Sequence, residues 1–188
     1  MQKFLLVGLG NIGLEYELTR HNIGFLIADA LAEELKLTFK NERLAAYAEG
    51  SFRGKKVFLI KPSTYMNLSG NAVRYWLKDL GIETQNSLTL VDDLALPMGE
   101  IRIKGSGSDA GHNGLTSIQE VLGTQKYPRL RFGIGSDFAK GKQVNYVLGQ
   151  WSDEEAKQLP ERISKCIEAI KEFMLGGLDA AMNKYNGK

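Results

Sequence analysis

The 188-residue chain is poor in the residues that build disulfides and metal centres. It contains one cysteine, Cys166, and two histidines. A single cysteine cannot form a disulfide framework or a multi-cysteine zinc site within the chain. A metal-dependent mechanism is therefore not expected.

Long apolar runs and a large excess of one charge are also missing. No segment approaches the roughly 18 consecutive apolar residues of a membrane helix, and the short apolar run near the N-terminus cannot serve as a signal-peptide core. We therefore expect a cytoplasmic protein with no membrane partner. The formal net charge of +2 is too small to indicate nucleic-acid binding by itself, so any basic surface for a polyanion must be local.

What is present is the composition of an ordinary globular protein. Hydrophobic residues make up 43% of the chain and charged residues 24%. The length suits one domain with a sizeable core, and no linker, repeat or low-complexity segment divides it. We expect a single domain spanning residues 1–188.

Strand-like and helix-like segments alternate along the chain. Short continuous apolar runs at 4–7, 56–60 and 87–91 predict strands covered on both faces, whereas 100–104 and 129–135 alternate like strands with one wetter side. Apolar stripes at helical spacing run over 22–35, 73–80 and 115–122. These patterns predict an α/β/α sandwich on a mostly parallel, mixed and twisted sheet.

The C-terminal third reads as helical. Ser152 followed by Glu155 is a capping-box pattern, and Pro160 is expected to start the helix anew. Cys166 falls on the apolar face of this helix, which predicts a buried thiol.

Gly8, Gly10 and Gly13 follow the first predicted strand in the spacing G-x-G-x-x-G. A dinucleotide site would also need a helix that begins inside the glycine cluster, and an acidic residue at the end of the next strand. Here the polar stretch LEYELTRHN intervenes, and the helical pattern begins only at Asn22. A nicotinamide-linked oxidoreductase would lack its ribose ligand, so we expect no nucleotide cofactor. The glycines are expected to form a tight turn that leads into an extended loop.

Polar side chains gather in loops that follow strands or precede a helix. In open α/β sheets, functional groups lie beyond the carboxyl ends of the strands. The loops that meet this criterion carry Asn11, Tyr16 and His21; then Tyr65, Met66 and Asn67; then Asp92 and Asp93; and finally His112 and Asn113.

This set of residues suits hydrolysis. A carboxylate such as Asp92 can fix the tautomer of a histidine such as His21, which then exchanges a proton near neutral pH. The chain has no G-x-S-x-G elbow and its cysteine is expected to be buried, so water is the expected nucleophile. Asparagine amides can hold a water or a substrate carbonyl. Hydrolysis of an ester or an amide fits these groups.

Each residue also has a structural explanation. Asn22, Asn67 and Asn113 precede helical patterns and can act as N-caps. Asp92 and Asp93 can form a turn, the tyrosines can pack, and the histidines can lie in loops that only face solvent. No single residue decides between these explanations and a site.

The order of the motifs is more specific than any one of them. The succession VGLGNIGLEYELTRHNIG, KPSTYMNLSG, DDLALPMG, GHNGLTSI and RLRFGIG resembles the bacterial-type peptidyl-tRNA hydrolase family over essentially the whole chain. The resemblance implies a single α/β domain that acts as a monomer and hydrolyses the ester between a peptidyl group and the 3' end of tRNA. It implies no cofactor, and it places the chain in the recycling of peptidyl-tRNA.

The resemblance also implies roles for individual residues. His21 would be the general base, Asp92 its orienting partner, and Asn11 the residue that binds the peptide and helps to tell blocked from free aminoacyl groups. Lys104 and Arg131 would hold a phosphate of the acceptor end, although both can also be solvated strand residues. The residues expected to contact the tRNA end and the substrate backbone are Tyr16, Tyr65, Met66, Asn67, His112 and Asn113.

Two positions depart from the family pattern. Ala95 stands where an acidic residue is common, and Ala110 stands where glycine is common. We expect the first to remove a supporting polar contact and the second to alter the mobility of the loop before His112. A non-catalytic RNA-binding or ribosome-associated module of the same fold is the alternative. Such a module would have no need for His21, Asp92 and the asparagines together.

Overall fold

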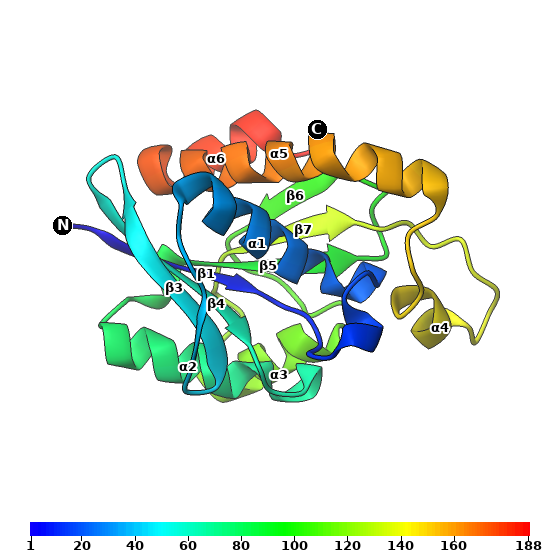
Figure 1. The fold of residues 1–188 in the computed structure, drawn as a ribbon, viewed down its shortest axis with the longest axis horizontal. Coiled ribbons are helices and arrows are strands. Elements are labelled where there is room, and N and C mark those ends of the chain that lie inside the picture. The colour runs from blue at the N-terminus through cyan, green and yellow to red at the C-terminus, as the bar shows by residue number, and fades with distance from the viewer.

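A seven-stranded sheet runs through the computed structural model, which describes all 188 residues (Figure 1). The strands lie in the order β2-β3-β4-β1-β5-β7-β6. The four strands β4, β1, β5 and β7 pair in parallel, whereas β2, β3 and β6 pair antiparallel at the edges. Their bounds are β1 Lys3–Gly8, β2 Lys40–Glu42, β3 Ala45–Phe52, β4 Lys55–Pro62, β5 Ser87–Asp93, β6 Ile101–Lys104 and β7 Arg129–Gly133. The predicted mostly parallel, mixed sheet is confirmed.

Helices cover both faces of the sheet. In Figure 1, α1, α5 and α6 lie on one face, and α2 and α3 lie on the other. The helices are α1 Ile23–Leu35, α2 Ser69–Leu80, α3 Asn113–Leu122, α4 Gln143–Val147, α5 Asp153–Gly176 and α6 Leu178–Tyr185. No helix combines the length and the apolar content that crossing a bilayer requires.

The two cores explain why the central strands are continuously apolar. Phe4 and Leu6 of β1 join the core under α1 and α5, whereas Leu5 and Val7 join the core under α2 and α3. Successive side chains of a strand point to opposite faces, so a strand with helices on both sides needs apolar residues at every position.

The prediction that β7 has one solvent-facing side is wrong, because all of its residues are buried. It lies between β5 and β6, and the loop after β6 covers its two arginines. The guanidinium of Arg129 is fully buried and donates to the backbone oxygens of Gln125, Tyr127, Gly107 and Ser108. Carbonyl oxygens thus take the place of water around the cation.

The N-terminal half of the sheet contains a hairpin that the apolar runs did not indicate. Strands β3 and β4 pair from Ala45 with Pro62 to Phe52 with Lys55. Between them, Arg53 and Gly54 have positive φ angles of 44° and 81°. A two-residue turn with positive φ at both positions matches the twist of an antiparallel pair. The Arg-Gly dipeptide was therefore the available sequence signal.

Two features were predicted for helix α5, a capping box and a restart at Pro160, and the structure confirms only the first. The capping box is confirmed, because Ser152 and Glu155 make the reciprocal hydrogen bonds. The predicted restart at Pro160 is wrong, because α5 runs through the proline from Asp153 to Gly176. The apolar stripe continues on both sides of Pro160, so packing outweighs one missing backbone hydrogen bond. Cys166 is buried as predicted, and burial raises the pKa of its thiol.

The parallel strands bring several loops to one edge of the sheet. The carboxyl ends of β1, β5 and β7 point toward the side of the molecule on which α4 lies, at the right of Figure 1. Because parallel strands share this edge, the segments that follow β1 and β5 meet there. Any site built from those segments must lie at this edge.

Candidate active site

His21 lies at the start of α1. The segment between β1 and α1 contains two short 3-10 turns, Leu14–Tyr16 and Arg20–Asn22, so the prediction of an extended loop was wrong. His21 is the middle residue of the second turn, which continues directly into the helix at Ile23. The position of the histidine is therefore tied to a helix that packs on the core.

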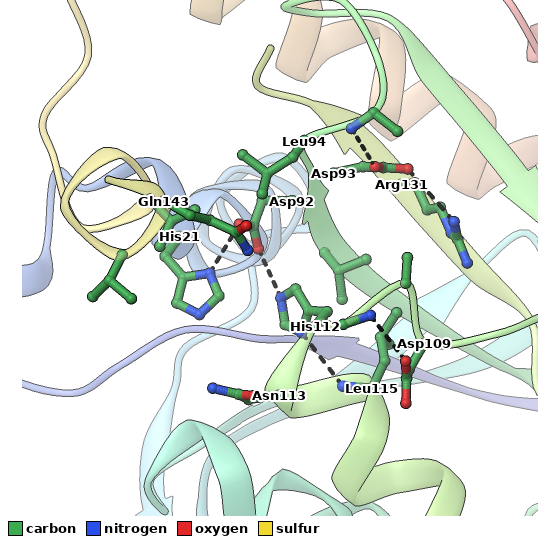
Figure 2. A pocket seen from close by; sticks show the side chains of 16 residues that line it. His21, Asp92, Asp93, Leu94, Asp109, His112, Asn113, Leu115, Arg131 and Gln143 are labelled. Atoms are coloured by element: carbon green, nitrogen blue, oxygen red, sulfur yellow. Dashed lines mark hydrogen bonds and ion pairs between the residues drawn. The ribbon is translucent and has the colours of Figure 1, made fainter. Parts of the chain in front are cut away.

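Asp92, near the end of β5, is shared by both histidines of the chain. One carboxylate oxygen lies 2.8 Å from Nδ1 of His21, and the other lies 2.8 Å from Nε2 of His112, as Figure 2 shows. The Asp92 side chain is only 3% exposed. The predicted pair of His21 and Asp92 is thus within hydrogen-bond distance, with His112 as a third member.

His112 is also the N-cap of α3. Its Nδ1 accepts hydrogen bonds from the backbone N–H groups of Gly114 and Leu115, at 3.0 and 3.4 Å. A nitrogen that accepts cannot carry a proton, so the proton of neutral His112 is on Nε2 and is donated to Asp92. The cap therefore fixes the tautomer of His112.

Their surroundings shift the pKa values of His21 and Asp92. Burial acts to lower the pKa of His21, but the charge and hydrogen bond of Asp92 outweigh it and raise that pKa above its ordinary value. Burial acts to raise the pKa of Asp92, but the two histidines hold it well below its usual range. Asp92 is therefore anionic at neutral pH. It accepts the Nδ1 proton of His21, which leaves His21 Nε2 free of hydrogen bonds within the protein.

These groups form one wall of a cavity of about 190 Å³ (Figure 2). Of the residues expected from the sequence, the cavity brings together His21, Asp92, Asp93, His112, Asn113 and Arg131. Its apolar lining comes from Val91, Leu94, Leu115, Val144 and Val147. The cavity thus combines an activated histidine with apolar surface for an organic group.

Asn11 lies outside this cavity and borders a neighbouring pocket. Its backbone is held on both sides by one side chain, because its N–H donates to Oδ1 of Asn22 at 2.8 Å and its carbonyl accepts from Nδ2 of Asn22 at 2.9 Å. The Asn22 side chain therefore does not cap α1, and the N-cap explanation is wrong at this position. The carboxamide of Asn11 makes no hydrogen bond within the protein.

Of the other residues for which a cap or a turn was predicted, the asparagines are not N-caps and one aspartate forms a turn. Asn67 lies inside a 3-10 turn, and Asn113 is the first residue of α3 after its cap. Asp93 does form a turn, since its Oδ1 accepts the backbone N–H of Ala95 at 2.8 Å. The turn explanation thus applies to Asp93, whereas Asp92 binds the two histidines.

The remaining predicted contact residues lie apart from the cavity lining. Tyr65 is 78% exposed and Asn67 is exposed beside it, whereas Tyr16 is half-buried. Met66 is 6% exposed and packs in the core under α2 and α3, next to the backbone of Gly114. Met66 therefore offers little surface to a ligand and instead packs against the start of α3.

The two expected phosphate ligands lie on neighbouring strands. Lys104 pairs with Arg129 across β6 and β7, so the side chains of Arg102, Lys104, Arg129 and Arg131 share one face of the sheet. Arg131 is 8% exposed, donates to the carbonyl of Ser108 at 2.8 Å, and lies 3.6 Å from Asp93. Its Nε has no partner within the protein. The face is strongly basic, although its innermost arginine is fully covered.

The loop before His112 contains one of the two unusual alanines. Ala110 has a left-handed φ of 52° and is followed by Gly111 with φ 78°. Asp109 holds this turn, because one carboxylate oxygen accepts the N–H of Gly111 and the other accepts the hydroxyl of Thr116. A left-handed φ is unfavourable for alanine and costs nothing sterically for glycine.

The wall of the cavity that α4 forms was not predicted from the sequence. Gln143, Val144 and Val147 come from α4, a helix of five residues. So short a helix shows no apolar periodicity, and it lies in a polar segment. The sequence contained no signal for this wall.

The cluster of His21, Asp92 and His112 could in principle hold a metal ion. One ligand atom from each lies within 4.8 Å of the other two. In the hydrogen-bonded arrangement, however, both ring nitrogens direct a proton at the carboxylate, and a metal would have to displace both protons. The cluster as it stands is arranged for proton exchange.

Comparison with known proteins identifies the family of the chain. The family model for peptidyl-tRNA hydrolase matches residues 5–188. The peptidyl-tRNA hydrolase of Phocaeicola vulgatus is 55% identical over 186 residues, covering 99% of this chain and all of that protein. The peptidyl-tRNA hydrolase of Porphyromonas gingivalis is 53% identical over 184 residues, covering 98% of this chain and all of that protein.

A solved structure shows the same fold. The crystal structure of peptidyl-tRNA hydrolase from Acinetobacter baumannii superimposes with a TM-score of 0.91 at 35% identity, covering 98% of this chain and 96% of that one. Sequence and fold agree over nearly the full length, and the chain belongs to the peptidyl-tRNA hydrolase family.

Proposed function

We propose that the chain hydrolyses the ester between the peptidyl group and the 3' end of tRNA, with His21 as the general base. One observation carries the assignment of His21. Its Nδ1 is bound to the buried carboxylate of Asp92, and its Nε2 is free at the cavity wall. This is the arrangement in which a neutral imidazole accepts a proton from water.

The reaction needs only water and these side chains. Nε2 of His21 takes a proton from water as the water oxygen attacks the ester carbonyl carbon, and the negative charge of Asp92 stabilises the imidazolium that forms. When the tetrahedral intermediate collapses, the bond to the ribose oxygen breaks and His21 returns the proton to that oxygen. The products are the free peptide acid and tRNA.

Asparagine side chains suit the neutral parts of such a substrate. Asn113 lines the cavity beside His112, and the carboxamide of Asn11 is free to pair with the amide of a peptide bond. We propose that Asn11 favours N-blocked substrates, because an unblocked α-ammonium would leave a donor and an acceptor poorly matched. Tyr16, Tyr65 and Asn67 are proposed to contact the 3' end of the tRNA.

The basic face of β6 and β7 is proposed to hold a phosphate of the acceptor end. Lys104 is half-buried there, and Arg131 keeps an unpaired Nε at the cavity side of the same face. Such contacts position the nucleic acid without reading its sequence. We propose that the chain acts as a monomer in the cytoplasm, since all the groups named here belong to one chain.

A comparison of two substrates tests the proposal. The protein should release free tRNA quickly from N-acetylaminoacyl-tRNA and slowly from unblocked aminoacyl-tRNA. His21→Ala should lower turnover about 100-fold or more, with much less change in tRNA binding. A binding-only RNA module would bind both substrates and release neither. Near-normal turnover of His21→Ala would remove His21 from the mechanism.

A further inference from the structure

Arg20, the residue before His21, makes an unusual number of contacts to distant parts of the chain. Its Nη1 donates to the carbonyl of Tyr146 at 3.0 Å, and its Nη2 donates to Glu155 at 2.9 Å. Its backbone N–H donates to the carbonyl of Gly149 at 3.0 Å. One residue of the histidine's own turn thus binds both α4 and the start of α5.

The guanidinium is also packed between aromatic rings. It lies 4.1 Å from the ring centre of Tyr146 and 6.0 Å from that of Trp151. Gly149 leaves room for it, because a methyl group at Gly149 would stand 3.0 Å from Nη1. The arginine side chain is 13% exposed, so the packed cation is largely shielded from water.

Glu155 neutralises the cation and connects it to the capping box of α5. The same Oε1 that binds Arg20 also accepts the backbone N–H of Ser152 at 2.8 Å. Burial acts to raise the pKa of Glu155, but its bonds to Ser152 and Arg20 outweigh it and lower that pKa. The carboxylate is therefore charged at neutral pH, and the ion pair is permanent there.

Few other hydrogen bonds hold α4, the segment that forms this wall of the cavity. Besides the contacts of Arg20, the hydroxyl of Tyr146 donates to the carbonyl of Ile134, and Thr19 forms a bridge with Gln150. Val144 is 66% exposed and α4 has no buried residue. Tyr146 and Val147 pack against the core but stay partly exposed, so the bonds of Arg20 add to a limited apolar contact in holding α4.

We propose that Arg20 is a positioning residue that fastens the α4 wall to the turn carrying His21. Arg20 does not line the cavity, so it acts through the wall to which α4 contributes Gln143, Val144 and Val147. When the link is intact, a peptidyl group held by the wall lies at a fixed distance from His21 Nε2. This role rests on the proposed function of the cavity, whereas the physical link between Arg20 and α4 does not.

A lysine in place of Arg20 keeps the positive charge but lacks the two guanidinium donors, Nη1 and Nη2, that bind Tyr146 and Glu155. Arg20→Lys cannot bind Tyr146 and Glu155 at once in the same geometry, nor stack flat on the ring. We expect kcat/KM for N-acetylaminoacyl-tRNA to fall about 10-fold or more, because small displacements of a bound substrate are costly to rate. The Kd for uncharged tRNA should stay within about 2-fold, because the basic face of β6 and β7 is untouched.

Hydrogen exchange supplies a readout that does not depend on activity. Amides of residues 146–149 should exchange faster in Arg20→Lys than in the wild type, while those of the central strands should not change. Guanidinium chloride added to Arg20→Gly should restore part of the turnover, whereas the same concentration of sodium chloride should not. Lys171→Gln is the matched control, because it removes another ion pair of α5, with Glu34 of α1, away from the cavity.

Beside Tyr146→Phe, a control that loses only the hydroxyl bond to Ile134, Tyr146→Leu is the second variant, because it removes the stacked ring and leaves Arg20 and Glu155 in place. It should show the same faster exchange and slower turnover, and it decides the matter if Arg20→Lys does not fold. Unchanged exchange at 146–149, or faster exchange with wild-type kcat/KM, would overturn the proposal. If the wild type itself released no tRNA, the proposed function would fail, and the exchange data would still show whether Arg20 holds the wall.

Discussion

Replacing Asp92 with asparagine should produce a specific error in the protonation of His21. The wild-type carboxylate accepts one hydrogen bond on each oxygen, from His21 and from His112, both at 2.8 Å. An asparagine offers one accepting oxygen and one donating nitrogen in the same place. One of the two histidines must therefore face a donor.

The N-cap of α3 decides which histidine that is. His112 cannot accept at Nε2 unless its proton moves to Nδ1, which would break the cap and set that N–H against the N–H groups of Gly114 and Leu115, at a cost of about 2 kcal/mol or more. Leaving donor against donor in this buried place costs about 1–3 kcal/mol. The amide oxygen should therefore turn to His112 with a preference of about 2 kcal/mol, or roughly 30-fold.

His21 then faces the amide nitrogen and must accept with Nδ1. Its proton moves to Nε2, the atom that should take a proton from water, so this tautomer cannot act as the base. The small fraction with the right tautomer also lacks the negative charge beside the imidazolium, and a hydrogen bond to a charged group contributes about 1.5–3 kcal/mol. The two effects, each roughly 30-fold, predict a loss in kcat on the order of 10³ with the fold intact.

Single-turnover release of tRNA from N-acetylaminoacyl-tRNA measures the loss, with Asp93→Asn as the control. Ring nitrogen NMR can report the tautomers directly, because the chain contains only two histidines. Adding His112→Asn to Asp92→Asn keeps a good N-cap while freeing the amide at 92 to turn toward His21, which should recover about 10-fold of the rate. An Asp92→Asn enzyme that keeps the His21 proton on Nδ1, or loses less than about 10-fold, would refute the reasoning.

Four further outcomes are expected. In the proposed mechanism neutral His21 is the active form, and its pKa is raised, so kcat/KM should fall as the pH drops through a value above about 6.5, as a pH–rate profile will show. Asn22→Ala removes both bonds to the Asn11 backbone and should lower the free energy of unfolding by about 2–3 kcal/mol in urea titrations, with slower turnover. Ala110→Gly relieves the left-handed φ of alanine at some entropic cost and should stabilise the fold by up to about 1 kcal/mol in the same titrations; a clear loss would contradict that account. Lys104→Ala should weaken binding of different tRNAs about equally and flatten log K against log[salt] by roughly 0.7 to 0.9, whereas a salt line parallel to the wild type would place the phosphate contact elsewhere.

The parts of the fold that sequence could predict are those set by local periodicity. The central stretches of β1 and β4 are continuously apolar, and β5 is buried throughout, because helices cover both faces, whereas α2 and α3 carry single apolar stripes because one side of each meets the sheet. Their alternation then places the loops after β1 and β5 at one edge, so the sequence alone predicts that His21 and Asp92 lie near each other.

The parts that could not be predicted depend on distant backbone. Arginine at alternate positions of β7 has the pattern of a solvated face, and the carbonyls of the segments after β6 and before β7 make its burial possible. At the start of α3, Asn113 belongs to the residue types that prefer N-caps, yet His112 takes that position because Asp92 binds its other nitrogen. In both places a long-range polar contact outweighs the local preference.

The geometry of the second 3-10 turn explains why three consecutive residues can serve three parts of the site. A 3-10 turn has three residues per turn, so successive side chains point about 120° apart. Arg20 reaches the α4 wall, His21 binds Asp92, and Asn22 holds the backbone of Asn11. In an extended segment, the first and third side chains would point to the same side, and one of these links would be lost. The turn therefore fixes the histidine relative to the cavity wall and to Asn11 at once, so a substitution on either side of His21 should change its environment without touching the imidazole.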